Sequence, residues 1–133
     1  MSSQDVHNKM DAVSAIDPAV YTATKVGDII DTDGAEGLEL VIQSGVLTTG
    51  TFTPKIEDGD DPALSDAADV ATAFLIGTIA EATFAVTDDN ATKKIGVVNH
   101  KRYVRLTLTG ASTPDGLIGA VAIKMPKNYR AIS

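Results

Sequence analysis

The sequence predicts a single all-β domain, a sandwich or barrel built from seven or eight short antiparallel strands. Apolar and polar residues alternate most clearly in residues 101–110, where Val104, Leu106 and Leu108 share one parity. Successive side chains of a strand point to opposite faces, so these three residues are expected in a core. Turn-forming residues separate similar segments at roughly ten-residue spacing, which is typical of sandwiches and barrels.

The chain begins with a segment of mostly small side chains, residues 1–20, that we predict to be an N-terminal arm. Met10, Val13 and Ile16 follow one another at the spacing of a helical stripe. The stripe is too short to be a stable helix alone. We therefore expect an arm that is either mobile or laid across a neighbouring molecule, with these three residues as candidate partner contacts in the second case.

Residues 21–126 are predicted to form one β-sandwich domain, followed by a C-terminal arm at residues 127–133. The predicted strands lie at residues 21–26 with 29–30, 38–45, 51–57, 82–87, 93–98, 101–110 and 117–124. Between two of them, residues 66–73 could hold a short helix capped by Ser65 or Asp66. The long crossover helices of an α/β sheet are missing from the pattern.

Charge is divided unevenly along the chain, which has a net charge of −7. Residues 1–90 carry three basic residues against seventeen acidic ones, and residues 91–133 carry eight basic residues against Asp115 alone. The simpler interpretation is that strands from the two halves pair and neutralise each other. The alternative is a basic patch that meets an acidic partner. Nucleic-acid binding is the least favoured, because the total charge is acidic.

Few residues could carry catalysis or a cofactor. The sequence has no cysteine, which excludes disulfides and thiolate metal sites, and its only histidines are His7 and His100. The acidic run at residues 57–61 resembles a calcium loop, but Gly59 and Pro62 interrupt the pattern, so a solvated turn is expected. A hydrolase using paired acids is the weakest alternative. We therefore expect that the protein is not an enzyme and that it holds no metal ion and no cofactor.

No apolar run approaches the ~18 residues of a membrane span, and the N-terminus lacks the features of a signal peptide. We therefore expect neither a membrane partner nor export. The candidate partner-binding residues outside the N-terminal arm are cationic or lie in the C-terminal arm. They are Arg102, Arg105, Lys124, Lys127, Tyr129 and Arg130, together with Ile132 as an apolar anchor. Arginine at such positions makes charge-assisted bonds of defined geometry to acidic groups, although a solvated cationic face is the simpler interpretation.

Two segments resemble a family of small proteins encoded among the head genes of tailed bacteriophages. The first is Gly-Thr-Phe-Thr-Pro-Lys-Ile-Glu-Asp-Gly-Asp-Asp at residues 50–61, and the second is Ile-Gly-Val-Val-Asn-His-Lys-Arg-Tyr-Val-Arg-Leu at residues 95–106. Val97 stands where an aromatic residue is expected after Ile95 and Gly96. The two arms match no pattern of that family.

The resemblance implies a virion structural protein with a jelly-roll-like sandwich, most plausibly a decoration (cement) protein on the outer surface of the icosahedral head. Its implied partners are the major capsid protein and further copies of itself, as a homodimer or homotrimer, with no small-molecule substrate. The implied location is the capsid surface, after synthesis in the bacterial host cytoplasm. Two alternatives remain: a head–tail connector or tail structural protein, and a module that binds carbohydrate or a cell surface.

Overall fold

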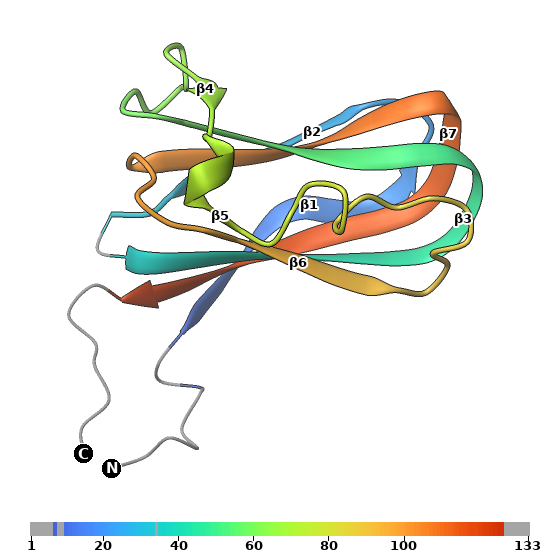
Figure 1. Ribbon diagram of the computed structural model, residues 1–133, viewed down its shortest axis with the longest axis horizontal. Helices are drawn as coiled ribbons and strands as arrows, with labels where there is room; N and C mark the ends of the chain where they lie inside the picture. Colours follow the sequence, from blue (N-terminus) through green and yellow to red (C-terminus); the bar gives the residue numbers. More distant parts are fainter. Residues whose placement is uncertain (1–6, 8–9, 34, 127–133) are drawn as a thin grey trace.

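The computed structural model describes residues 7, 10–33 and 35–126, and its central feature is a long two-stranded antiparallel ribbon (Figure 1). Strand β3 (Ala35–Gly59) pairs with strand β7 (Tyr103–Pro126) from one end to the other. Both strands bend together where their register shifts, between Ser44 and Thr51 of β3. The two halves of the ribbon therefore lie in two different layers of the molecule, as Figure 1 shows.

Gly50 makes the bend possible. Its φ angle is +74°, in the left-handed region that favours glycine. A Cβ atom at this position would lie 2.5 Å from the carbonyl oxygen of Ala111 and 2.6 Å from the Cα of Pro114. A side chain at residue 50 would therefore force the two strands apart at the corner.

One layer, called here the β1 layer, contains the N-terminal half of β3 and the C-terminal half of β7. Strand β1 (Asp11–Tyr21) pairs with β7 on one side, and β6 (Thr92–Val97) pairs with β3 on the other. The two-residue strand β5 (Leu75–Ile76) extends the sheet beyond β6, which gives the order β1-β7-β3-β6-β5.

The other layer, called the β2 layer, contains the remaining halves of the ribbon. Strand β2 (Lys25–Asp31) pairs with the N-terminal half of β7, and the two-residue strand β4 (Ala68–Asp69) pairs with the end of β3. A single turn of 3-10 helix, Thr72–Phe74, follows β4. No helix among the described residues is long and apolar enough to cross a membrane.

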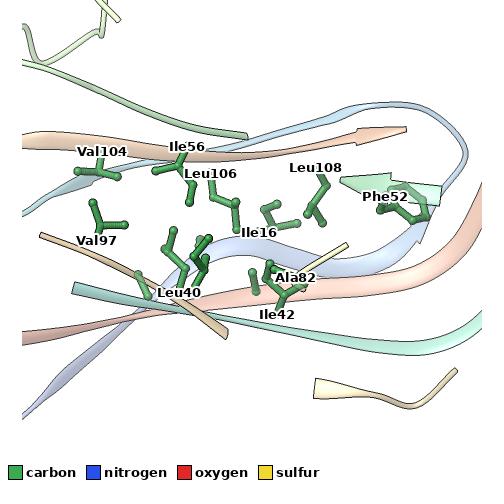
Figure 2. Packing of buried hydrophobic residues seen from close by; sticks show 14 of the residues in the cluster. Ile16, Leu40, Ile42, Phe52, Ile56, Ala82, Val97, Val104, Leu106 and Leu108 are labelled. Atoms are coloured by element: carbon green, nitrogen blue, oxygen red, sulfur yellow. The ribbon is translucent and has the colours of Figure 1, made fainter. Parts of the chain in front are cut away.

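The hydrophobic core lies between the two layers (Figure 2). Val104, Leu106 and Leu108 of the β2 layer are fully buried and point toward Leu40 and Ile42 of the β1 layer. Because Val104, Leu106 and Leu108 alternate along β7 with Arg105, Thr107 and Thr109, the parity read from residues 101–110 is confirmed. The antiparallel, all-β, jelly-roll-like sandwich predicted from the sequence is also confirmed.

The strands, however, are not uniformly short. The predicted strands at 38–45 and 51–57 are two halves of β3, which has 25 residues, and those at 101–110 and 117–124 are two halves of β7, which has 24. The stretches that separate them bend the chain and shift the register, and the pairing of β3 with β7 continues on both sides of the bend. A separate turn was therefore the wrong interpretation of those stretches.

Two further local predictions are wrong. Residues 66–73 contain β4 and the start of the 3-10 turn, and no α-helix forms there. Residues 82–87 form turns, in which Phe84 alone makes a bridge to Phe52. Both segments connect β3 to β6 and follow their contacts with β3, which override the local propensities.

The predicted N-terminal arm is wrong for residues 11–20. They belong to β1, which pairs with residues 116–124 of β7, and Ile16 is only 1% exposed in the core. The sandwich therefore begins at Asp11 and not at residue 21. The rest of that arm, except His7 and Met10, and the whole predicted C-terminal arm at 127–133 lie outside the described residues.

Replacing Ile16 with alanine tests this assignment. We expect the free energy of unfolding to fall by about 2–5 kcal/mol, because the change removes buried methyl groups and leaves a cavity. The matched control is Val20→Ala in the same strand, where Val20 is 63% exposed and the loss should stay within about 0.5 kcal/mol. Equal losses for both variants, measured by urea unfolding, would contradict the assignment of β1 to the core.

Candidate interaction surface

The outward faces of the two layers differ in chemistry, although both are built largely from β3 and β7. On the β2 layer, the outward positions of the two strands are polar or charged. They are Thr53, Lys55, Glu57, Arg105, Thr107 and Thr109. On the β1 layer, the outward positions of β7 are apolar or glycine: Leu117, Gly119, Val121, Ile123 and Met125. Val41 of β3 lies beside Val121 on the same face.

Ion pairs cover the outer face of the β2 layer. Arg105 donates from Nη2 to Oε1 of Glu57 at 3.2 Å, across the paired strands, and both side chains are mostly buried. Lys55 lies 3.8 Å from the other oxygen of Glu57 and 3.9 Å from Asp69 of β4. The charged side chains on this face are therefore paired with one another within the chain.

The two segments that carry the resemblance meet at this same place. Residues 56–59 of the first segment pair with residues 103–106 of the second, so Glu57 stands opposite Arg105 and Asp58 opposite Val104. The backbone N–H of Lys101 also donates to the Asp58 carboxylate at 2.9 Å. The order and spacing of the two segments thus reflect one cross-strand unit of the fold.

An apolar groove of about 610 Å³ runs along the outer face of the β1 layer. Its lining includes Val41, Leu117 and Val121, with Gly119 between the two β7 residues. A Cβ on Gly119 would lie 2.8 Å from the Cα of Pro18, so β1 crosses close over that position. The groove therefore has a wall made by β1 and a floor made by β7 and β3.

Glu39 and Lys94 flank this apolar face. Glu39 lies opposite Gly96 and Ile123 in the register, and Lys94 lies opposite Val41. The Glu39 side chain covers Gly96, where a Cβ would lie 2.9 Å from its Oε1. Partial burial raises the pKa of Glu39, while the nearby charge of Lys94 acts in the opposite direction. In the described part of the chain, neither side chain forms an ion pair.

The structure places the predicted cationic residues in contacts within the chain. Arg102 makes a bidentate pair with Asp31, with Nε–Oδ1 and Nη2–Oδ2 distances of 2.9 and 3.0 Å. Lys124 lies 3.7 Å from Asp11 and donates to the backbone carbonyl of Asp31. These residues and Arg105 are therefore not brought together as one free basic patch.

The same pairs explain the uneven charge of the sequence. Each described ion pair of a basic residue after position 90 joins it to an acid from the first 90 residues. These bases are Lys93, Arg102, Arg105 and Lys124. The interpretation that the two halves neutralise each other is confirmed for these four residues.

The apolar residues predicted as anchors are dispersed. Ile16 lies in the core, so its side chain is not accessible to a partner, which corrects its assignment as an anchor. Val13 is half-buried against the core and also lines the groove, and Met10 is half-buried just before β1. The predicted residues Lys127, Tyr129, Arg130 and Ile132 lie outside the described residues.

The acidic turn after β3 uses its carboxylates to hold the backbone. Asp66 accepts from the N–H groups of Asp60 and Asp61, and Asp61 accepts from those of Ala63 and Ser65. The N–H groups of Ser65 and Ala63 lower the pKa of Asp61, and that of Asp60 lowers the pKa of Asp66. Within the described ranges, no group of three or more histidine or acidic residues could hold a metal ion.

The groove was missed from the sequence, although a signal for it was present. Residues 117–123 are apolar or glycine at both parities, whereas residues 103–109 alternate. A strand that is apolar at both parities is typical of a sheet covered on both faces. The prediction of a strand at residues 117–124 did not take into account that both of its faces are apolar.

Comparison with known proteins gives only distant structural neighbours. No family model matches the chain, and a search of curated proteins finds no match. The SPBc2 prophage-derived protein YomS is 12% identical, with 86% of this chain and 91% of that chain covered and a TM-score of 0.49. A protein of Bacillus endospore appendages, described as disulfide-linked pili, is 14% identical, with coverages of 88% and 86% and a TM-score of 0.48.

A third neighbour comes from the structure of infectious bursal disease virus, Gx strain. It is 16% identical, with 91% of this chain and 34% of that chain covered and a TM-score of 0.41. At these identities and TM-scores, none of the three proteins assigns a function or a partner to this chain.

The Glu57–Arg105 pair can be tested by a double-mutant cycle. Glu57→Gln should lower the free energy of unfolding by about 1–3 kcal/mol, because it leaves a mostly buried guanidinium without its charged partner. Arg105→Met should cost a similar amount, and the double variant should lose less than the sum of the two. Strictly additive losses in urea unfolding would show that the two side chains do not interact.

The Asp31–Arg102 pair predicts a dependence of stability on acid. The hydrogen bonds from Arg102 and from the backbone N–H of Asp33 lower the pKa of Asp31 from 3.8 to about 2. A carboxylate with a lowered pKa in the fold stabilises it above the unfolded-state pKa and loses that effect as pH falls. The contribution of Asp31 should therefore disappear between about pH 4 and pH 2.

Asp31→Asn should accordingly reduce the fall in unfolding free energy over this acid range, measured by urea unfolding at a series of pH values. Asp28→Asn is the matched control, since Asp28 is exposed in the same strand and belongs to none of the described ion pairs. An acid response of Asp31→Asn identical to that of the unaltered protein would refute the assignment.

Proposed function

We propose that this chain is a virion structural protein, and more specifically a decoration protein that binds the outer surface of a bacteriophage head and stabilises contacts between capsomers. The observation that carries this proposal is the pairing of the two segments that resemble head-gene proteins. Residues 56–59 of the first segment pair with residues 103–106 of the second in one ribbon, with Glu57 opposite Arg105, so the fold joins two segments that are far apart in the sequence.

Binding of this kind stabilises a shell by mass action. A protein that binds the assembled shell, and not its separate subunits, shifts the equilibrium toward the shell. If each attached unit has two or more contact sites, the second contact forms at a high effective concentration. Modest individual contacts are then sufficient for nearly complete occupancy.

The ends of the described sandwich suggest where such contacts could begin. Asp11 at the start of β1 stands opposite Lys124 near the end of β7, and the two side chains form an ion pair. The start of β1 and the end of β7 therefore lie side by side at one end of the β1 layer. Tyr129 and Arg130, predicted from the sequence to contact the capsid, belong to residues 127–133, which follow β7 in the sequence.

Deleting residues 127–133 should weaken binding to empty phage shells in co-sedimentation, because the deletion removes the proposed anchors and none of the described contacts. Tyr129→Ala alone should reduce the affinity roughly tenfold or more, since a buried aromatic anchor typically contributes more than about 1 kcal/mol. Asn128→Ala is the adjacent control and should bind as the unaltered protein does. Equal shell occupancy by all three variants would refute the role of this segment.

The number of copies per purified particle tests the function itself. A decoration protein should be present in numbers comparable with those of the capsomers and should be spread over the head. A head–tail connector would be confined to a single ring at one vertex. Absence from mature particles would exclude both functions and leave the carbohydrate or cell-surface module, for which a glycan array is the direct test.

A further inference from the structure

The outer face of the β1 layer is unusual for a sheet that faces water. Along a strand of an antiparallel sandwich, polar residues at the outward positions normally alternate with apolar residues at the buried positions. Here Leu117 is 40% exposed and Val121 is 42% exposed, and Val41 lies beside Val121. The other halves of the same two strands carry the charged and threonine-rich face of the β2 layer. A contiguous exposed apolar patch of this kind marks an interaction site.

We propose that this face is the surface through which two copies of the chain associate, sheet against sheet about a two-fold axis. The occupant of the groove is thus a second copy of the same β1 layer. Outward side chains of the two sheets would interdigitate, as they do between the sheets of a sandwich, at a spacing of about 10 Å.

The size of the face is sufficient for such a dimer. Four neighbouring strands at about 4.8 Å spacing, over about nine residues of β7, cover roughly 570 Å² per copy. Burial on both copies gives about 1,100 Å², which is above the roughly 1,000 Å² expected of a biological interface and exceeds the area of most lattice contacts. The groove and the side chains beside it give each face depressions and protrusions, which two complementary surfaces need in order to interdigitate.

Charge supports a second copy over an unrelated partner. A two-fold interface must be complementary to itself, so the same patch has to carry both members of any ion pair. Glu39 and Lys94 satisfy this condition, since both flank the apolar face and neither forms an ion pair in the described part of the chain. Across the axis, Glu39 of each copy would meet Lys94 of the other.

This inference does not depend on the proposed virion function, because the dimer should form in the absence of capsids. A dimer would, however, give a decoration protein two equivalent attachment sites, as multivalent binding requires. The two proposals therefore fail separately: the first in solution with the purified protein alone, and the second on particles.

The first experiment measures mass in solution by sedimentation equilibrium over a range of concentrations. The unaltered protein should approach twice the 13.8 kDa of one chain. Val121→Asp should shift the equilibrium to the monomer, because it places a charge in the centre of the apolar face. Thr109→Asp is the matched control: it makes an equivalent change on the exposed outer face of the β2 layer and should remain a dimer. Circular dichroism verifies that both variants are folded.

The second experiment uses the charges and leaves the apolar residues unchanged. Glu39→Lys makes the flanking charges of the face entirely positive, and Lys94→Glu makes them entirely negative, so each variant alone should dissociate. A mixture of the two should form a heterodimer, because each positive face then meets a negative one. The double variant Glu39→Lys with Lys94→Glu should dimerise as the unaltered protein does.

Three results would overturn the proposal. The first is that the unaltered protein is a monomer at every concentration. If Val121→Asp then also abolishes binding to shells, the apolar face belongs to the contact with the capsid. The second is a dimer that persists with Val121→Asp, which would place the interface elsewhere. The third is failure of the two oppositely charged variants to associate when mixed.

Discussion

The fold depends on the pairing of β3 with β7, which continues in a shifted register on both sides of a corner. Because the two strands bend together, one ribbon supplies the centre of both layers, and β1, β2, β4 and β6 pair directly with its edges. Gly50 allows this, since the close approach of Ala111 and Pro114 leaves no room for a side chain. The pairing also sets basic residues of the second half of the chain against acidic residues of the first, as with Arg105 and Glu57.

Sequence reasoning succeeded where burial follows from alternation within one strand. Val104, Leu106 and Leu108 could be assigned to the core because the pattern around them has a period of two. Reasoning failed where burial depends on a distant partner. Ile16 is buried because β1 pairs with residues about a hundred positions later, and Phe84 because it bridges to Phe52. Nothing local distinguishes such residues from those of a mobile arm or a regular strand.

The candidate surface was predictable only in part. The cationic residues Arg102, Arg105 and Lys124 were predicted to pair with acidic groups of a partner, but their described ion pairs lie within the same chain. A charge pattern alone cannot separate these two outcomes, because it does not contain the register that sets Arg105 opposite Glu57. The apolar face was indicated by strand residues that are apolar at both parities. That signal becomes specific only when the fold shows which side is already covered.

The position of β7 at the end of the described chain has a consequence for how the protein is made. Three strands synthesised earlier, β1, β2 and β3, all take β7 as a hydrogen-bonding partner. During translation, β1 and β2 therefore have no strand to pair with until β7 leaves the ribosome. Pairings this distant in sequence form slowly, commonly in milliseconds to seconds. The nascent chain is accordingly exposed to aggregation in the cell until β7 has been synthesised.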